Sequence, residues 1–294
     1  MSALMDASSP PSGHMVVRLV TLNIRYATKT PVPGEEPWSV RSPKLCAQLS
    51  FLTAGLSSVF VCLQEVLYSQ LIDIEAHLGP SWKHIGRGRE DGDKNGEFSP
   101  IFFRADFWDC EREQTFWLSP TPEIPSRGWD AALKRIVTVG SFRHKNTGAV
   151  VTVMSTHLDH RGETAREESA RLLLRIAKNW TEDSSLVFLG GDFNSTPNGS
   201  AYKALTLQGS GMKDVSELVP DGLRYGNQEI TYTTFGEPNE KPKRIDFLFA
   251  QRPLRLKCLS FGILENRFDD NVYLSDHRPV VADLEIPLEA GRVC

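Results

Sequence analysis

The chain has 294 residues, of which 40% are hydrophobic and 9% aromatic, an ordinary composition for a soluble globular protein with a sizeable core. Its formal net charge of −4 argues against a protein whose whole surface binds nucleic acid, although it leaves room for a local basic cleft. The five cysteines are odd in number, widely spaced and without a C-x-x-C motif, which argues against a disulfide framework and against a zinc site. We therefore expect an intracellular protein, most simply a cytoplasmic one.

One domain is predicted, because strand-like runs are spread evenly along the chain and no Pro/Gly/Ser-rich linker divides it. We place this domain at residues 15–286, after a disordered N-terminal tail at 1–14 and before a C-terminal tail at 287–294. The N-terminal tail lacks an apolar core of secretory length, so it is interpreted as a loose tail and not as a signal peptide. No stretch reaches transmembrane length, and we expect a monomer with no membrane span and no obligate protein partner.

Taken in chain order, apolar runs rich in Val, Ile, Leu and Phe predict a series of strands. They lie at residues 16–24, 59–63, 82–85, 99–103, 136–142, 149–157, 186–189, 245–250, 256–263 and 280–284. Between two of these strands, Asn146, Thr147 and Gly148 supply the turn residues of a hairpin, so a purely parallel sheet is disfavoured.

Helices are predicted between the strands. Ser42-Pro43 is expected to cap a helix that ends near Gly55, a second helix is expected at residues 68–78, and Thr164 is expected to open a capping box for a third that ends near Trp180. The order of strands and helices predicts an α/β fold: a four-layer α/β sandwich in which two mixed, mainly antiparallel sheets pack face to face with helices outside.

Polar side chains recur where these apolar runs end or begin. In the segment GGDFNSTP, Asp192 and Asn194 are two residues apart, so in a strand they would project from the same face. Other apolar runs also have polar residues at one end, namely Asn23, Glu65, His157, Asp246, Asp276 and His277. Unpaired carboxylates gathered together would repel one another, so a cation or an imidazolium is expected among them.

The set contains carboxylates, imidazoles and carboxamides but no cysteine. Such hard, oxygen-rich surroundings suit Mg²⁺, with Mn²⁺ as a substitute, better than zinc. A phosphoester transition state spreads negative charge over its oxygens, and a cation, imidazoles and amides placed around phosphorus would stabilise it.

Six segments, TLNIRY, CLQEV, STHL, GGDFNSTP, KRIDFLF and LSDHRPVV, resemble in this order the signature segments of the endonuclease/exonuclease/phosphatase superfamily, the group related to DNase I. The resemblance covers nearly the whole chain. It implies the four-layer sandwich, an active site at one end of the two sheets, and magnesium-dependent cleavage of a phosphate ester.

The resemblance also implies roles for individual residues. It identifies Glu65 as the principal metal carboxylate, with Asn23 beside the metal and Asp276 completing that side. Asp192 would help to deprotonate the attacking water, and Asn194 would orient Asp192 or bind a phosphate oxygen. His277, held by Asp246, would face the scissile phosphate. Whether Asp192 or His277 is the base is left open. His157 would bind another phosphate oxygen or assist the leaving group. Glu97, in the segment GEFSPIFF, would orient His157. From their positions alone, Arg25 just after Asn23 and Arg135 before the strand at Ile136 are candidates for phosphate contacts, with a plain surface charge as the alternative for each.

The substrate is left open by the resemblance, because this superfamily contains enzymes for several phosphate esters. Our first hypothesis is a phosphodiesterase acting on nucleic acid, such as single-stranded DNA or RNA, or on a nucleotide-like compound. The alternative is a phosphomonoesterase of a small phosphorylated metabolite, such as a sugar or inositol phosphate. A binding protein that keeps the fold without the activity is disfavoured, since no acid or histidine of the set is missing.

Overall fold

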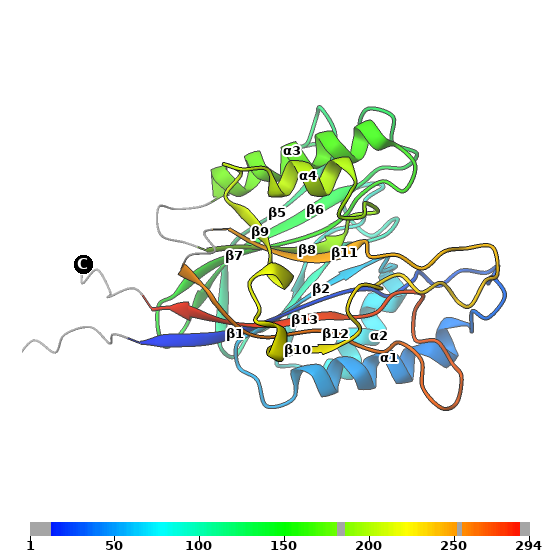
Figure 1. Cartoon of the computed structure of the whole chain (residues 1–294), viewed down its shortest axis with the longest axis horizontal. Coiled ribbons are helices and arrows are strands. Elements are labelled where there is room, and N and C mark those ends of the chain that lie inside the picture. The colour runs from blue at the N-terminus through cyan, green and yellow to red at the C-terminus, as the bar shows by residue number, and fades with distance from the viewer. Residues whose placement is uncertain (1–12, 181–185, 252–254, 289–294) are drawn as a thin grey trace, which may run out of the picture.

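The computed structural model describes residues 13–180, 186–251 and 255–288. Its strands form two stacked sheets, each covered on its outer face by helices (Figure 1). The first sheet has the order β10-β12-β13-β1-β2-β4-β3, and the second has the order β5-β6-β7-β8-β11-β9. The four-layer α/β sandwich predicted from the sequence is therefore confirmed.

The first sheet consists of β1 (His14–Asn23), β2 (Val59–Gln64), β3 (Trp82–Ile85), β4 (Ile101–Arg104), β10 (Arg224–Gly226), β12 (Lys257–Ile263) and β13 (Val280–Pro287). The second consists of β5 (Trp108–Trp117), β6 (Ile136–His144), β7 (Val150–His157), β8 (Leu186–Asp192), β9 (Met212–Asp214) and β11 (Asp246–Gln251). The helices are α1 (Trp38–Thr53), α2 (Tyr68–Leu78), α3 (Glu163–Trp180) and α4 (Ser200–Thr206), with 3-10 turns at η1 (Val215–Glu217) and η2 (Asp221–Leu223).

Three hydrophobic clusters hold the four layers together. The central cluster fills the space between the sheets, where Phe60 of β2 packs against Trp108 and Phe142 of the other sheet. A second cluster joins α3 and α4 to the second sheet, and a third joins α1 and α2 to the first. Burial of this apolar surface on both faces of each sheet is the main stabilising contribution to the sandwich.

Strand direction decides which strand ends meet. β1 pairs in parallel with β2, and β7 pairs in parallel with β8. The Asn23 amide at the end of β1 lies 3.1 Å from the Asp192 carboxylate at the end of β8, so the carboxyl ends of all four strands lie at the same end of the sandwich. β11 runs antiparallel to β8, and its first residue, Asp246, is paired with Asp192 at the end of β8. The end of the molecule opposite the start of β1 and the tip of β13 therefore collects these strand ends (Figure 1).

The predicted strands and the helix at 68–78 are all present, and the turn at 146–148 joins the antiparallel strands β6 and β7. The start of α1 differs from the prediction: this helix begins at Trp38, so Ser42 and Pro43 lie inside it. α3 also begins one residue before Thr164, and the carboxylate of Asp130 accepts hydrogen bonds from the backbone N–H groups of Thr164 and Ala165. A distant acid therefore does the capping that was assigned to Thr164.

Both predicted tails lie largely outside the described residues. Within the described residues, β1 begins at His14 and β13 ends at Pro287. Within the described ranges, no helix is both long enough and apolar enough to cross a membrane.

Candidate active site

The site is built from strand ends of both sheets. Asn23 ends β1, Glu65 follows β2, His157 ends β7 and Asp192 ends β8. Hydrogen bonds join residues from one sheet to residues from the other. Arg25, Glu65 and Asn194 have positive φ angles of 58°, 60° and 47°, a backbone conformation that is strained for non-glycine residues and concentrates at functional sites.

Asn23 connects the two sheets. Its side-chain amide donates to Oε1 of Glu65 at 2.9 Å and to Oδ2 of Asp192 at 3.1 Å, while its oxygen accepts from the backbone N–H of Arg25 at 2.9 Å. Asn23 is completely buried. In this arrangement Asn23 presents an N–H group to the two carboxylates. Beside a metal, Asn23 would therefore position Glu65.

Burial alone would raise the pKa of Glu65, but the hydrogen bond from Asn23 and the positive charge of Arg25 outweigh burial and lower it. Tyr26 adds a backbone N–H donated to Oε2 of Glu65 at 3.2 Å. The pKa of Asp276 is raised, first by burial and also by the negative charge of Glu65. Glu65 is therefore held as a carboxylate, and its negative charge disfavours ionisation of the nearby Asp276.

Asp246 and His277 form a buried pair, with 2.8 Å between Oδ2 of the acid and Nδ1 of the imidazole. Nε2 of His277 lies 3.7 Å from Oδ2 of Asp192. Burial lowers the pKa of His277, but the charges of Asp246 and Asp192 dominate and raise it to about 10. Burial and the charge of Asp246 raise the pKa of Asp192 to about 7. His277 is thus an imidazolium between two acids, the geometry predicted for an oriented histidine.

His157 and Asn194 flank Asp192 on its other side. The amide of Asn194 donates to Nε2 of His157 at 3.0 Å, and that nitrogen is 3.3 Å from Oδ2 of Asp192. The backbone N–H of Asn194 donates to Oδ1 of Asp192 at 2.9 Å. Burial, with the charge of Arg135, lowers the pKa of His157 well below its ordinary value, so this histidine is neutral.

Glu97 is near His157 but does not hydrogen-bond to it. Oε2 of Glu97 is 3.9 Å from Nδ1 of His157, which has no hydrogen-bond partner among the described residues, whereas Arg89 donates to that oxygen at 2.6 Å. Burial, followed by the negative charge of Glu65, raises the pKa of Glu97 to about 7. Glu97, expected to orient His157, therefore makes no hydrogen bond to it in this structure, and Arg89 is the hydrogen-bond partner of Glu97.

The two arginines assigned to phosphate are both engaged by protein groups. Arg25 forms a two-point ion pair with Glu35, at 3.0 and 3.2 Å. Arg135 is 5% exposed, lies 3.9 Å from Glu97, and has Nη2 3.1 Å from Nδ1 of His160. Both add positive charge to the site. Nε and Nη1 of the buried Arg135 have no hydrogen-bond partner among the described residues, so these two nitrogens are not used in hydrogen bonds by the present neighbours.

Supporting residues outside the predicted set hold the site residues in place. The hydroxyl of Ser275 donates to the backbone oxygen of Asn23 at 2.6 Å and accepts from the backbone N–H of His277. The hydroxyl of Thr231 accepts from the backbone N–H groups of Ile245 and Asp246. Ser275 precedes the acid-imidazole pair in the segment LSDHRP, but nothing in the sequence pattern marks Thr231 or Arg89.

Two groups of atoms could bind a cation. Ligand atoms of Asp192, Asp246 and His277 lie within 4.8 Å of one another. In this group Nδ1 of His277 and Oδ2 of Asp246 already lie 2.8 Å apart, so a cation bound here would have to compete with that contact. Glu65 and Asp276 are the second group, and two mutually repelling carboxylates among neutral and basic neighbours fit a hard divalent ion. We therefore favour Glu65 and Asp276 as metal ligands.

Comparison with known proteins identifies the family of the chain. Residues 20–277 match the model of the Endonuclease/Exonuclease/phosphatase family. The structure of an endonuclease/exonuclease/phosphatase from Bacteroides vulgatus is 34% identical with a TM-score of 0.82, and the match covers 92% of this chain and 99% of that chain. A mannosyl-6-phosphatase from Bacteroides thetaiotaomicron is 30% identical with a TM-score of 0.80, covering 91% and 99% of the two chains.

Two other similarities are weaker evidence for the family assignment. D. rerio TDP2 in complex with a single strand DNA product is 17% identical with a TM-score of 0.70, over 92% of this chain and 98% of that chain, and shares the fold. An uncharacterised protein of Acanthamoeba polyphaga mimivirus is 34% identical over 178 residues, which are 58% of this chain and 63% of that protein. The family model and the two Bacteroides structures decide the assignment: the chain belongs to the endonuclease/exonuclease/phosphatase family, whose members hydrolyse phosphoesters.

Proposed function

We propose that this protein is a divalent-metal-dependent phosphoesterase that removes phosphate from a small, sugar-like phosphate monoester. Hydrolysis of a phosphoester is supported by the continuous contact network that runs from Glu65 through Asn23 and Asp192 to His277 and Asp246. Its atoms belong to both sheets and to five separate segments of the chain. Such a network places acids, an imidazolium and amides around one point, as charge stabilisation of a phosphoryl group requires.

Glu65 and Asp276 would hold the metal ion, Mg²⁺ or Mn²⁺. When bound, that ion would neutralise charge on a phosphate oxygen. Glu65 suits this role because Asn23 and the backbone of Tyr26 fix both of its oxygens while it stays ionised. Asn23 would therefore act as a positioning residue.

The remaining steps belong to side chains of the chain itself. His277, charged and fixed by Asp246, would donate a hydrogen bond from Nε2 to a phosphate oxygen. Asp192 would accept the proton of the attacking water, since its Oδ1 is held by the backbone N–H of Asn194 and its pKa of about 7 allows it to exchange a proton near neutrality. The amide of Asn194 and neutral His157 would contact further phosphate oxygens or the leaving group. The charged state of His277 favours Asp192 as the base.

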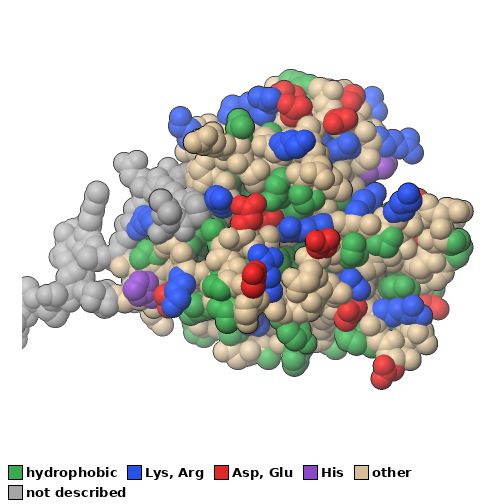
Figure 2. All heavy atoms as spheres, viewed as in Figure 1, with side chains coloured by type: hydrophobic (Ala, Val, Ile, Leu, Met, Phe, Trp, Pro, Cys, Tyr) green, Lys and Arg blue, Asp and Glu red, His purple; other side chains and the backbone are tan. Residues whose placement is uncertain are grey.

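The substrate class is proposed from relatedness and charge. The relative at 30% identity and nearly full coverage carries the description mannosyl-6-phosphatase, a monoesterase of a sugar phosphate. On the face shown in Figure 2, lysine and arginine side chains are interspersed with acidic ones, and the net charge of the chain is −4. A long polyanion is less favoured by such a surface than a small phosphorylated molecule.

A panel of substrates tests this proposal. Mannose 6-phosphate, glucose 6-phosphate, an inositol monophosphate, single-stranded DNA and RNA would each be incubated with the protein and Mg²⁺, and released phosphate or nucleotides would be measured. We expect phosphate release from a sugar phosphate and no release with excess EDTA. Cleavage of the nucleic acids with no action on the monoesters would overturn the monoester proposal and support the phosphodiesterase hypothesis drawn from the sequence.

A further inference from the structure

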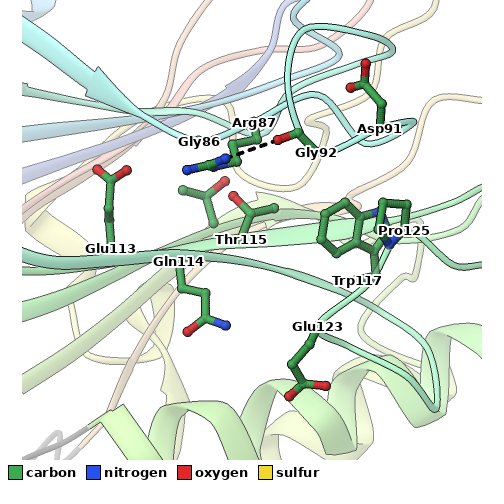
Figure 3. Close-up of a pocket in the computed structure, with 11 residues that line it drawn as sticks. Gly86, Arg87, Asp91, Gly92, Glu113, Gln114, Thr115, Trp117, Glu123 and Pro125 are labelled. Carbon is green, nitrogen blue, oxygen red and sulfur yellow. Dashed lines mark hydrogen bonds between the residues drawn. The ribbon is translucent and has the colours of Figure 1, made fainter.

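A pocket of about 350 Å³ lies at the edge of the sandwich, between β5 and the loop that follows β3 (Figure 3). One wall is formed by Arg87, Asp91 and neighbouring glycines, and the other by Glu113, Thr115 and Trp117 of β5. Its volume is within the range of small-molecule binding sites. None of these residues is used by the proposed reaction.

The floor of the pocket contains a buried hydroxyl without a partner. Thr138 is 1% exposed, and its Oγ1 has no hydrogen-bond partner among the described residues. Thr138 of β6 is paired in register with Thr115 of β5, so both side chains project from the same face. A buried polar group that stays unpaired costs stability, and a ligand hydroxyl that reached it would remove this cost.

The charges at the rim do not favour a cation. Both carboxylate oxygens of Asp91 are already used, by the backbone N–H groups of Asp93 and Asn95 and by the side-chain amide of Asn95. Arg87 places a positive charge at the same rim, where it donates to the backbone oxygen of Gly92 at 3.3 Å (Figure 3). Glu113 and Glu123 are solvent-exposed, so water and salt screen their charges. The buried part of the pocket is therefore neutral and polar.

The pocket is connected to the active site through one loop. The indole N–H of Trp117 donates to the backbone oxygen of Arg89 at 2.8 Å, and the side chain of Arg89 holds Glu97 at 2.6 Å. A methyl group added at Gly92 would lie 3.0 Å from the Trp117 ring, so glycine allows the loop to pack closely over this wall. The pocket and the phosphate site thus share the segment 86–97 but use different side chains.

We propose that this pocket binds a neutral, hydroxyl-rich ligand the size of a monosaccharide unit, as a second subsite beside the phosphate site. Hydroxyls of Thr115 and Thr138 and the exposed carboxylate of Glu113 offer donors and acceptors for ring hydroxyls, and Trp117 offers an apolar wall. The proposal does not depend on the catalytic assignment, because binding here requires neither metal nor phosphate.

The test uses the full chain and methyl α-D-mannopyranoside as the probe, without phosphate or metal. The indole N–H signal of Trp117 would be followed by NMR during titration, after assignment with Trp117→Phe. We expect a saturable shift of this signal, and about 5-fold weaker binding in Thr138→Val, which removes one hydroxyl at nearly constant shape. Thr152→Val is the matched control, because the Thr152 hydroxyl is buried in the same sheet but bonds to the backbone oxygen of Trp180, and it should leave the affinity unchanged.

Two further readouts separate this proposal from the catalytic one. Hydrolysis of p-nitrophenyl phosphate, which carries no sugar, should be unchanged in Thr138→Val, and the melting temperature of this variant should not fall, because its hydroxyl has no internal partner. An indole signal that does not move with tens of millimolar glycoside would overturn the proposal. So would equal affinity of the wild type and Thr138→Val, or a response to 1,4-diaminobutane in place of the glycoside.

Discussion

Asp246 and His277 are 31 positions apart in the sequence, yet Oδ2 of the acid and Nδ1 of the imidazole are 2.8 Å apart in a buried pair. Their contact depends on β11, which begins at Asp246 beside the end of β8, and on the turn before β13, which carries His277. The fold thus fixes both the orientation and the charge of this imidazole, and the consequence can be measured.

Asp246→Asn should lower kcat by about 10²-fold or more, because an amide can still hydrogen-bond but no longer stabilises the imidazolium. Initial rates of phosphate release measure this effect. Asp214→Asn is the matched control: Asp214 is an equally buried acid that holds Tyr202 and Arg244, so its loss should reduce stability with little change in kcat. Equal losses of kcat in the two variants would contradict a specific role for Asp246.

Asn194 allows backbone and side-chain effects to be separated. Its φ is 47°, so Asn194→Gly should fold without strain, while Asn194→Ala should be less stable than the glycine variant by about 1 kcal/mol. Both variants lose the amide that contacts His157, so both should lose activity to a similar extent. Chemical denaturation and kinetics would check the two effects, and retention of full activity in Asn194→Gly would show that the amide has no catalytic part.

The lowered pKa of Asp159 should make its contribution to stability depend on pH. Burial opposes its charge, but backbone N–H groups of Gly162, Arg161, Ala132 and Leu133 lower its pKa to about 2 from an ordinary 3.8. Because the unfolded chain binds this proton more readily, stability rises with pH between these two values. The contribution, about 2 kcal/mol, is present above pH 4 and is lost as the pH falls through 2.

Asp159→Asn should therefore be less stable than the wild type by about 2 kcal/mol at pH 7, and this difference should shrink below pH 4. Urea unfolding at a series of pH values gives both free energies. A difference that stays constant from pH 7 to pH 2 would show that the Asp159 charge is not the cause.

Glu65→Gln should weaken metal binding. Wild-type protein is expected to gain up to about 2.7 kcal/mol of stability at a Mg²⁺ concentration 100 times the dissociation constant, whereas Glu65→Gln should need much more Mg²⁺ for the same gain. Thermal unfolding over a Mg²⁺ titration measures this, with Glu75→Gln, a surface acid paired with His84, as the control. Identical titrations of the wild type and Glu65→Gln would place the ligand elsewhere.

The long apolar runs predicted most of the strands, because a buried strand of a sandwich reads as continuous hydrophobic sequence. β5 was not predicted: it is an edge strand with a polar middle, and its pairing with β6 is interrupted by a register shift between Cys110 and Arg112. The short strands β9 and β10 were also missed, since they fall in a segment without apolar periodicity. Their pairing partners, and not their own residues, make them strands.

For the site, strand ends could be predicted, but contacts between segments could not. The pairing of Arg89 with Glu97 and the capping of α3 by Asp130 depend on loops that meet in three dimensions. The direction of the Asn23 amide likewise depends on where Glu65 and Asp192 lie. Residue type and spacing therefore predicted candidate residues at the strand ends, and tertiary structure determines which of them pair.

The most direct test of the account is the rate of phosphate release from mannose 6-phosphate by wild-type protein and by Asp192→Asn, each with Mg²⁺ and with EDTA. Asparagine keeps the shape of this buried residue, so the variant should fold, and circular dichroism would check that it does. We expect rapid release only for the wild type with Mg²⁺. Full activity of Asp192→Asn, or of the wild type in EDTA, would contradict it.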